Sequence, residues 1–231
     1  TAYARDGMSL RRLAELRFTH PTNEVSDVAL SPDGRLALAA VREGGHLQVL
    51  RFDGQQWGVE PRRISVYGRP YRVLFTPDGR LALTAGAGAG NAPDTDALTV
   101  IAVKGNTFRT TDFVALGSGP ESIELSPDGR HALGVMMNGS NLPADSPHRT
   151  GQGQLVLLER TGDTFVRRQV LPVGRIPEGA CFTPDGRHVV VQCHPERRLW
   201  ILALHRGRLK DTGRRVDVPG FPSGLGAGGG R

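Results

Sequence analysis

One five-residue pattern, [ST]-P-D-G-R, occurs four times in the chain and constrains its fold more than any other feature. The copies span 31–35, 76–80, 126–130 and 183–187 of the 231 residues. Proline fixes φ near −65° at the first central position of a turn, Asp suits the second, and Gly accepts the positive φ that closes a hairpin. Each copy is flanked by short apolar runs, as in VLFTPDGRLALTA. The pattern therefore predicts four β-hairpin turns.

The spacing of these turns predicts a repeat of about 50 residues, which lies within the range of propeller blades. Their prolines, at positions 32, 77, 127 and 184, lie 45, 50 and 57 residues apart. A second turn in each repeat, such as VKGN at 103–106, separates two further strand-like runs. In the second repeat we expect strands at about 71–75, 80–84, 97–103 and 107–116. Four-stranded units of this length stack radially, so the predicted fold is an all-β propeller of four-stranded antiparallel blades.

We expect one domain over residues 1–231, with four whole blades and one shared or partial blade. The N-terminal segment supplies only the two outer strands of a blade, whereas VPGFPSGL near Pro222 begins like an innermost strand. The two ends are therefore predicted to complete one shared blade. The approximate boundaries are 1–18 (partial), 25–66, 69–117, 119–173, 176–218 and 219–231 (a partial closing strand).

A third signature, a proline seven residues before the turn proline, occurs at Pro70, Pro120 and Pro177. The combined pattern, G-x-P, six residues and then [ST]-P-D-G-R, resembles the YVTN-type and lactonase-like β-propellers of bacteria over nearly the whole chain. Propellers of that group usually have seven blades, and some of them are enzymes of the 6-phosphogluconolactonase type. The matching residues are turn and core positions, so the resemblance implies the fold more strongly than the chemistry.

The residues that follow these prolines are expected to face the central channel. They include Tyr71, Glu121 and Glu178. Two carboxylates that approach one axis are able to ligate a divalent cation or to share a proton as acid and base. Hydrogen bonding to backbone at a solvated mouth is the alternative. The aspartates of the [ST]-P-D-G-R turns, which we place on the opposite face, are interpreted as turn residues.

The loops between the second and third strands are expected at the same mouth, and they differ in length. The longest spans 136–153, and it is interpreted either as a binding loop or as a mobile insertion. Candidate ligand-binding residues are Tyr71, Arg72, His46, Asn138, Asp145, His148, Glu196 and Arg197.

For a hydrolase, the candidate catalytic residues are Glu121, Glu178 and His194. A lactonase needs an activated water and a stabilised oxyanion. His194 or Glu178 would serve as the base, while Arg72 or Arg197 would counter the negative charge. The chain has no G-x-S-x-G, H-E-x-x-H or P-loop motif, so this assignment depends on the resemblance.

Three functions follow, and the sequence leaves open whether the protein is an enzyme. The first is a binding scaffold that recognises a small ligand or a protein at the channel mouth. The alternative is a lactone hydrolase, with a divalent cation as the possible cofactor. The third is a weak nucleic-acid binder, which the net charge of +6 permits but the dispersed arginines disfavour.

Cysteine content and hydropathy bear on the compartment. Cys181 and Cys193 are the only cysteines, and their spacing predicts neither a disulfide nor a metal site. No run reaches the roughly 18 apolar residues of a membrane span, and the first ten residues contain no apolar signal-peptide core. We therefore expect no membrane span, while an exported, periplasmic or cytoplasmic location stays open.

Overall fold

The computed structural model describes residues 1–17, 24–88 and 95–226. These residues form eighteen strands and one short 3-10 helix, η1 (His194–Glu196). Sixteen of the strands make four antiparallel sheets of four strands each, in which neighbours along the sequence are neighbours in the sheet. The predicted all-β propeller of four-stranded blades is therefore confirmed.

The four blades are numbered in chain order. Blade 1 holds β3 (Val25–Leu30), β4 (Leu36–Val41), β5 (His46–Phe52) and β6 (Trp57–Ser65). Blade 2 holds β7 (Arg69–Phe75), β8 (Leu81–Ala87), β9 (Asp96–Lys104) and β10 (Thr107–Gly117). Blade 3 holds β11 (Pro120–Leu125), β12 (His131–Met136), β13 (Gly153–Thr161) and β14 (Thr164–Val173). Blade 4 holds β15 (Pro177–Phe182), β16 (His188–Cys193), β17 (Arg198–His205) and β18 (Arg208–Asp217).

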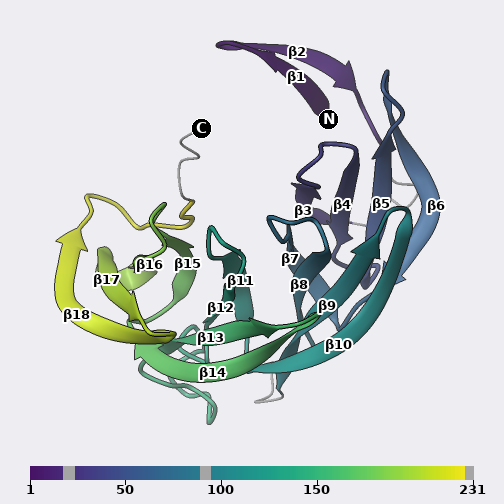
Figure 1. Cartoon of the computed structure of the whole chain (residues 1–231). Coiled ribbons are helices and arrows are strands. Elements are labelled where there is room, and N and C mark those ends of the chain that lie inside the picture. Colours follow the sequence, from purple (N-terminus) through teal and green to yellow (C-terminus); the bar gives the residue numbers. More distant parts are fainter. Residues whose placement is uncertain (18–23, 89–94, 227–231) are drawn as a thin grey trace.

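The blades are arranged as an arc (Figure 1), and we call the concave side of this arc the channel. The first strand of each blade (β3, β7, β11 and β15) lies on the concave side, and the fourth strand lies on the convex side. β1 (Ala2–Asp6) and β2 (Ser9–Ala14) form a separate two-stranded sheet beyond blade 1. In the described part of the chain this pair bonds to no further strand, and residues 218–226 form no strand. The predicted pairing of the two ends into one sheet is therefore not formed among these residues.

The [ST]-P-D-G-R turns are built the same way in all four blades. The hydroxyl of the leading Ser or Thr donates a hydrogen bond of 2.6 Å to Oδ1 of the Asp. The same Oδ1 accepts from the backbone amide of the Arg. Gly34 has φ of 69°, and the other three turn glycines have φ of 67°. The five residues are thus fixed by local chemistry, and the aspartates serve the turn.

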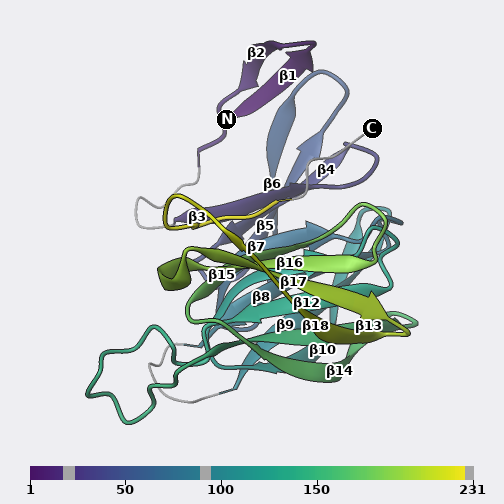
Figure 2. The same cartoon turned by 90° about the vertical axis from the view of Figure 1, so that its left-hand side faces the viewer.

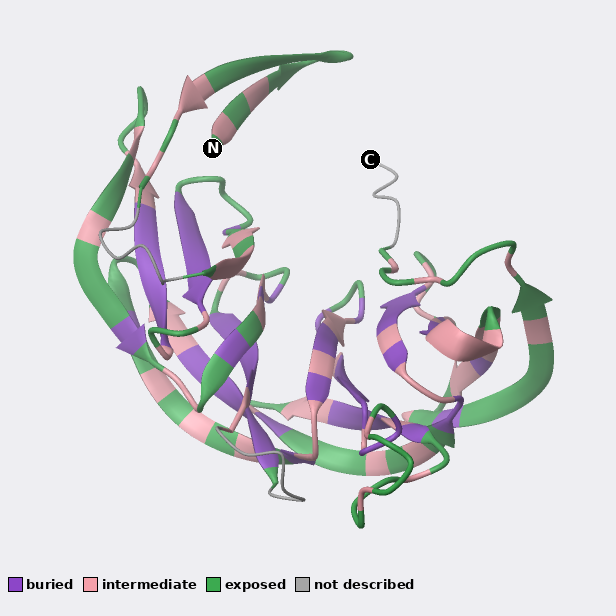
Figure 3. Cartoon of the chain, turned by 180° about the vertical axis from the view of Figure 1, so that it is seen from behind, coloured by how far each residue is buried: buried purple, intermediate pink, exposed green. Residues whose placement is uncertain are grey.

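The hydrophobic core lies between blades, not within one blade. Between blades 2 and 3, for example, Leu83 and Leu98 belong to the same buried cluster as Val156 and Phe165. Equivalent clusters join blades 1 and 2 and blades 3 and 4. Buried residues concentrate on the middle strands, while the outer strands are largely exposed (Figure 3). Because burial of a large apolar side chain contributes about 1.5–3 kcal/mol, these interfaces hold the blades together.

Two further observations complete the fold. Cys181 and Cys193 are both buried and unbridged, as the sequence predicts. In the ranges that the structure describes, no helix has the length and apolar character to cross a membrane.

Candidate functional site

Each innermost strand has a β-bulge near its start, and we use the name channel mouth for the region around the residues at these four bulges. The register with the second strand shifts at the same place in all four blades. A bulge leaves one residue without a cross-strand partner and re-aims its side chain. The residues at these four positions are Ser26, Tyr71, Glu121 and Glu178.

The negative charges at the mouth change the pKa values of Tyr71 and Glu121. The negative charge of Glu121 raises the pKa of the Tyr71 phenol, and partial burial adds to this effect. Burial raises the pKa of Glu121, and the charge of Glu178 raises it further. The Arg42 guanidinium lies 5.3 Å from the centroid of the Tyr71 ring, and its charge partly offsets both shifts. Glu121 therefore keeps its proton to a higher pH than an ordinary carboxyl group does.

His194 lies beside Glu178 at the same mouth. Its Nδ1 is 3.6 Å from Oε1 of Glu178 and 3.1 Å from the carbonyl oxygen of Pro222. A carbonyl oxygen only accepts, so Nδ1 carries the hydrogen and the lone pair of the neutral ring is on Nε2. One face of the imidazole stacks on Phe221, with ring centroids 5.2 Å apart. His194 is thus oriented on two sides and has one basic nitrogen.

The structure brings together the three residues proposed as catalytic, Glu121, Glu178 and His194, and it adds Tyr71 to them. Their roles in a reaction stay predictions. Arg42, which interacts with Tyr71, was not singled out from the sequence. Its position at the start of the first mouth loop, directly after β4, was the available signal.

A second polar group lies further along the innermost strands and joins three blades. Nη2 of Arg72 is 3.4 Å from Oε2 of Glu124. Burial raises the pKa of Glu124, and the Arg72 charge opposes this effect. Burial also raises the pKa of the Cys181 thiol, with a smaller contribution from Glu124. Nε of Arg72 is buried and has no hydrogen-bond partner among the described residues. Arg72 is thus engaged inside the channel, and Glu124 is a partner that sequence reasoning missed.

Glu196 and Arg197 lie next to His194 but make other contacts. Oε1 of Glu196 accepts a hydrogen bond of 2.9 Å from the amide of Arg175. Gly174 packs so closely that a Cβ there would lie 2.5 Å from both carboxylate oxygens. Arg197 has a positive φ of 52°, and its guanidinium lies 4.3 Å from the centroid of the Phe221 ring. Glu196 therefore holds the loop between β14 and β15 in place.

His46 and the long loop of blade 3 do not join the cluster at Glu121. His46 is buried, and its Nδ1 lies 2.9 Å from the carbonyl oxygen of Gly44. Asn138 closes the base of the long loop, where its Nδ2 donates to the carbonyl oxygen of Gln152. The exposed residues Asp145 and His148 lie on the loop itself, which extends away from the innermost strands (Figure 2). Ligand binding by these four residues stays a prediction.

The two carboxylates left a divalent cation open as a possible cofactor. In the part of the chain that the structure describes, no three His, Cys, Asp or Glu side chains are grouped so as to hold a metal ion. The residues at the mouth therefore do not fit a metal centre, and no step below depends on one.

Several solved structures that resemble this chain carry lactonase names, and another is described as a β-propeller domain. A Bacteroides uniformis protein provisionally named 6-phosphogluconolactonase has a TM-score of 0.74 and 16% identity, over 94% of this chain and 64% of that one. The periplasmic gluconolactonase of Pseudomonas aeruginosa has a TM-score of 0.67 and 23% identity, over 88% and 57%. The likeness shows that the fold is a β-propeller.

A third match has a β-propeller domain and carries no lactonase name. The β-propeller domain of Cps50 from Myceliophthora thermophila has a TM-score of 0.55 and 15% identity, over 86% of this chain and 56% of that one. No protein-family model and no curated protein matches the sequence. The chain spans 57–64% of the length of the two lactonase-named structures. At these identities the likeness shows the fold, and the reaction has to be argued from the site.

Proposed function

We propose that the channel mouth binds a small lactone and hydrolyses its ester bond. The observation that carries this proposal is the arrangement of His194. Its Nδ1 hydrogen is held by the Pro222 carbonyl, and the Glu178 carboxylate lies 3.6 Å away. A fixed tautomer with a nearby carboxylate is the arrangement that makes an imidazole an effective general base.

In the proposed reaction, Nε2 of His194 removes a proton from a water molecule. The hydroxyl oxygen forms a bond to the lactone carbonyl carbon, and the Glu178 charge stabilises the imidazolium. The ring carbon–oxygen bond then breaks, and the imidazolium returns the proton to the departing alkoxide. The product is the open-chain hydroxy acid, so water is the sole co-reactant.

Negative charge develops on the carbonyl oxygen during this attack and has to be stabilised. The Tyr71 phenol and the Arg42 guanidinium supply a hydrogen-bond donor and a positive charge at the same mouth. Because the pKa of Tyr71 is raised, its hydroxyl keeps the hydrogen that it would donate. The lactonase names of the similar structures support this choice of substrate class.

A binding scaffold is the second candidate function. Polar side chains from four blades meet at the mouth, as the contacts of Arg42, Tyr71, Glu121 and Glu178 describe. Such a set is able to orient a small ligand without chemical turnover. This candidate shares the site with the lactonase and differs from it only in the outcome of binding.

Hydrolysis of glucono-δ-lactone at constant pH, followed by base uptake and corrected for spontaneous opening, separates the two candidates. We expect wild-type turnover, and a loss of at least 100-fold in kcat for His194→Gln and Glu178→Gln. His188→Gln, at the start of β16 beside the [ST]-P-D-G-R turn and away from η1, is the control and should keep its activity. Unchanged kcat in His194→Gln would refute the hydrolase. Saturable binding without turnover would support the scaffold, and absence of both would refute both candidates.

A further inference from the structure

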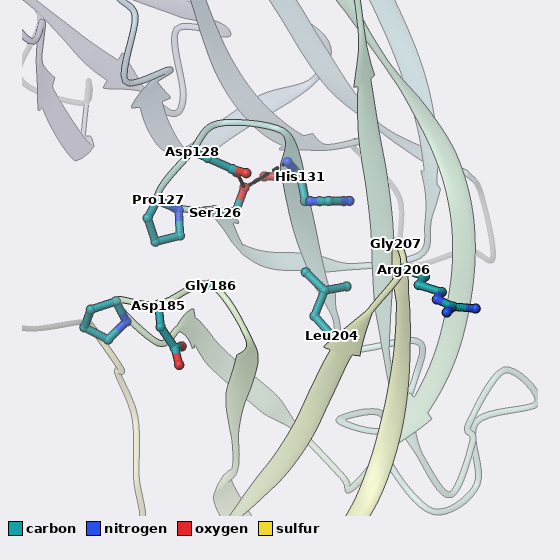
Figure 4. A pocket seen from close by; sticks show the side chains of 10 residues that line it. Ser126, Pro127, Asp128, His131, Asp185, Gly186, Leu204, Arg206 and Gly207 are labelled. Atoms are coloured by element: carbon teal, nitrogen blue, oxygen red, sulfur yellow. Dashed lines mark hydrogen bonds between the residues drawn. The ribbon is translucent and has the colours of Figure 1, made fainter.

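A cleft between blades 3 and 4 opens on the face of the [ST]-P-D-G-R turns, opposite to the channel mouth. Its volume is about 470 Å³. Two of those turns and the hairpin between β17 and β18 form its walls (Figure 4). An adjoining cavity of about 650 Å³ shares His131, Arg206 and Gly207 with it. Together they form a groove, and each volume lies in the roughly 300–1,000 Å³ range of small-molecule sites.

An inter-blade ion pair that bridges the neighbouring interface has no counterpart at this cleft. Between blades 2 and 3, Nη1 of Arg160 in β13 is 2.8 Å from Oδ2 of Asp78 in the preceding turn. The equivalent residue of blade 4 is Leu204, because the amides of Arg160 and Leu204 bond to the last carbonyl of the turn in their own blade. Among the described residues, Asp128 therefore has no ion pair with blade 4 that corresponds to the Arg160–Asp78 pair.

The turns themselves also stand further apart at this interface. A Cβ on Gly129 would lie 2.8 Å from Cδ of Pro77, which belongs to the turn of blade 2. A Cβ on Gly186 would lie 3.9 Å from Cδ of Pro127, which belongs to the turn of blade 3. The wider spacing between blades 3 and 4 agrees with the position of the cleft.

Arg206 occupies a backbone position at which other hairpins have glycine. Its φ is +50°, in the left-handed region that non-glycine residues rarely adopt. The equivalent residues of three other hairpins are Gly7, Gly105 and Gly162, with φ of 57°, 55° and 61°. An arginine at this position costs about 1 kcal/mol or more in backbone energy. Strain of this kind is typical of functional positions, and here it places a guanidinium group at the edge of the cleft.

The outer part of the groove is strongly basic. Its lining includes five arginines against one carboxylate, that of Glu159. Arg168 binds Glu159 at 2.7 Å and so neutralises it. In the ranges that the structure describes, neither Arg206 nor Arg208 has a carboxylate within 4.0 Å. The lining arginines are Arg130, Arg160, Arg168, Arg206 and Arg208.

We propose that this groove binds a small organic anion with more than one negative charge, carried by phosphate or carboxylate groups. Arg206 and Arg208 would hold the oxyanions, because a guanidinium presents paired donors that match both groups. The imidazole of His131 lies near the hairpin tip, with its Nε2 3.8 Å from an ideal Cβ on Gly207. In the inner part, Pro127, Pro184 and Leu204 offer apolar contacts to the carbon body of the ligand. The Asp128 and Asp185 carboxylates also line this part, and each accepts hydrogen bonds from the hydroxyl and the backbone amide of its own turn. The site is separate from the channel mouth.

Calorimetric titration of the full chain with inorganic pyrophosphate and with citrate, at low ionic strength, tests this site. We expect saturable 1:1 binding of at least one anion. Arg206→Gly introduces the residue that the equivalent hairpins have at this position, so the turn should be retained. The substitution removes the guanidinium group and should weaken binding at least tenfold. Arg109→Ala removes an exposed arginine from blade 2 and should leave the affinity within twofold.

The outcomes are distinct. The proposal fails if neither anion binds saturably, or if Arg206→Gly and Arg109→Ala weaken binding equally, since that would indicate a general charge effect. If the thermal melt of Arg206→Gly shows that it does not fold, Arg208→Gln replaces it with the same expected loss. A preference for pyrophosphate would assign phosphate groups to the ligand, and a preference for citrate would assign carboxylates.

Discussion

Oε2 of Glu196 accepts a 3.1 Å hydrogen bond from the indole Nε1 of Trp200. Its other oxygen accepts from the backbone amide of Arg175, so one carboxylate joins η1, β17 and the loop before β15. The loop leads into β15, which contains Glu178, and η1 contains His194. Glu196 was a candidate ligand-binding residue in the sequence. In the structure its carboxylate accepts hydrogen bonds from Arg175 and Trp200, and these bonds stabilise the segments next to the channel mouth.

Glu196→Gln should destabilise the protein by about 1–3 kcal/mol, since the amide nitrogen would face one of the two donors and leave it unsatisfied. Urea unfolding followed by circular dichroism measures the difference. Glu43→Gln, at a side chain that is 39% exposed, is the control and should change stability by less than about 0.5 kcal/mol. Equal costs for the two variants would show that the Glu196 contacts contribute nothing special.

Glu121 predicts a dependence of stability on pH. Its pKa in the folded protein is raised above the ordinary value of 4.5, chiefly by burial and then by the charge of Glu178. The stability that it contributes is therefore fully present below about pH 4.5 and is lost as pH rises through the raised pKa. Glu121→Gln keeps the size of the side chain and removes this titration.

The thermal midpoint of Glu121→Gln relative to wild type should accordingly be higher at pH 7.5 than at pH 4. The difference should shrink in a Glu178→Gln background, because the second cause of the shift is then absent. Differential scanning calorimetry at the two pH values measures both effects. A relative midpoint that falls between pH 4 and pH 7.5 would contradict the assigned direction.

The parts of the fold that depend on local chemistry were predictable from the sequence. The turn at Ser31–Arg35 is specified by five adjacent residues, and its hydroxyl–carboxylate bond recurs in each blade. The approach of Glu121 and Glu178 followed from their equal distance from the turn prolines. The sequence repeat therefore predicts both the positions of the hairpins and the residues that lie at the mouth.

Other features, including contacts between blades at positions outside the repeated motifs, left no local signal in the sequence. Arg72 meets Glu124 across 52 positions in the sequence, and neither residue belongs to a motif. The strain at Arg206 is similar, since only its alignment with the glycines of other hairpins marks it. The direction of the loop that bears Asp145 depends on packing, which its polar composition does not encode.

The Arg72–Glu124 pair provides the last prediction. Removing one partner of a buried ion pair typically costs about 3–5 kcal/mol, because the other charge is left uncompensated. The Arg72 side chain is 36% exposed and that of Glu124 is 20% exposed, so solvent weakens the interaction. We therefore expect Glu124→Leu to cost about 1–3 kcal/mol, a range that applies to a polar group left without its partner.

The double variant Arg72→Met, Glu124→Leu should recover most of this loss, since it replaces both charges with apolar groups of similar length. A double-mutant cycle in urea, with Arg72→Met as the second single variant, measures the coupling. Costs that simply add would mean that the two side chains do not interact. A recovered double variant would show that the pair stabilises the channel only while both charges are present, because each compensates the burial of the other.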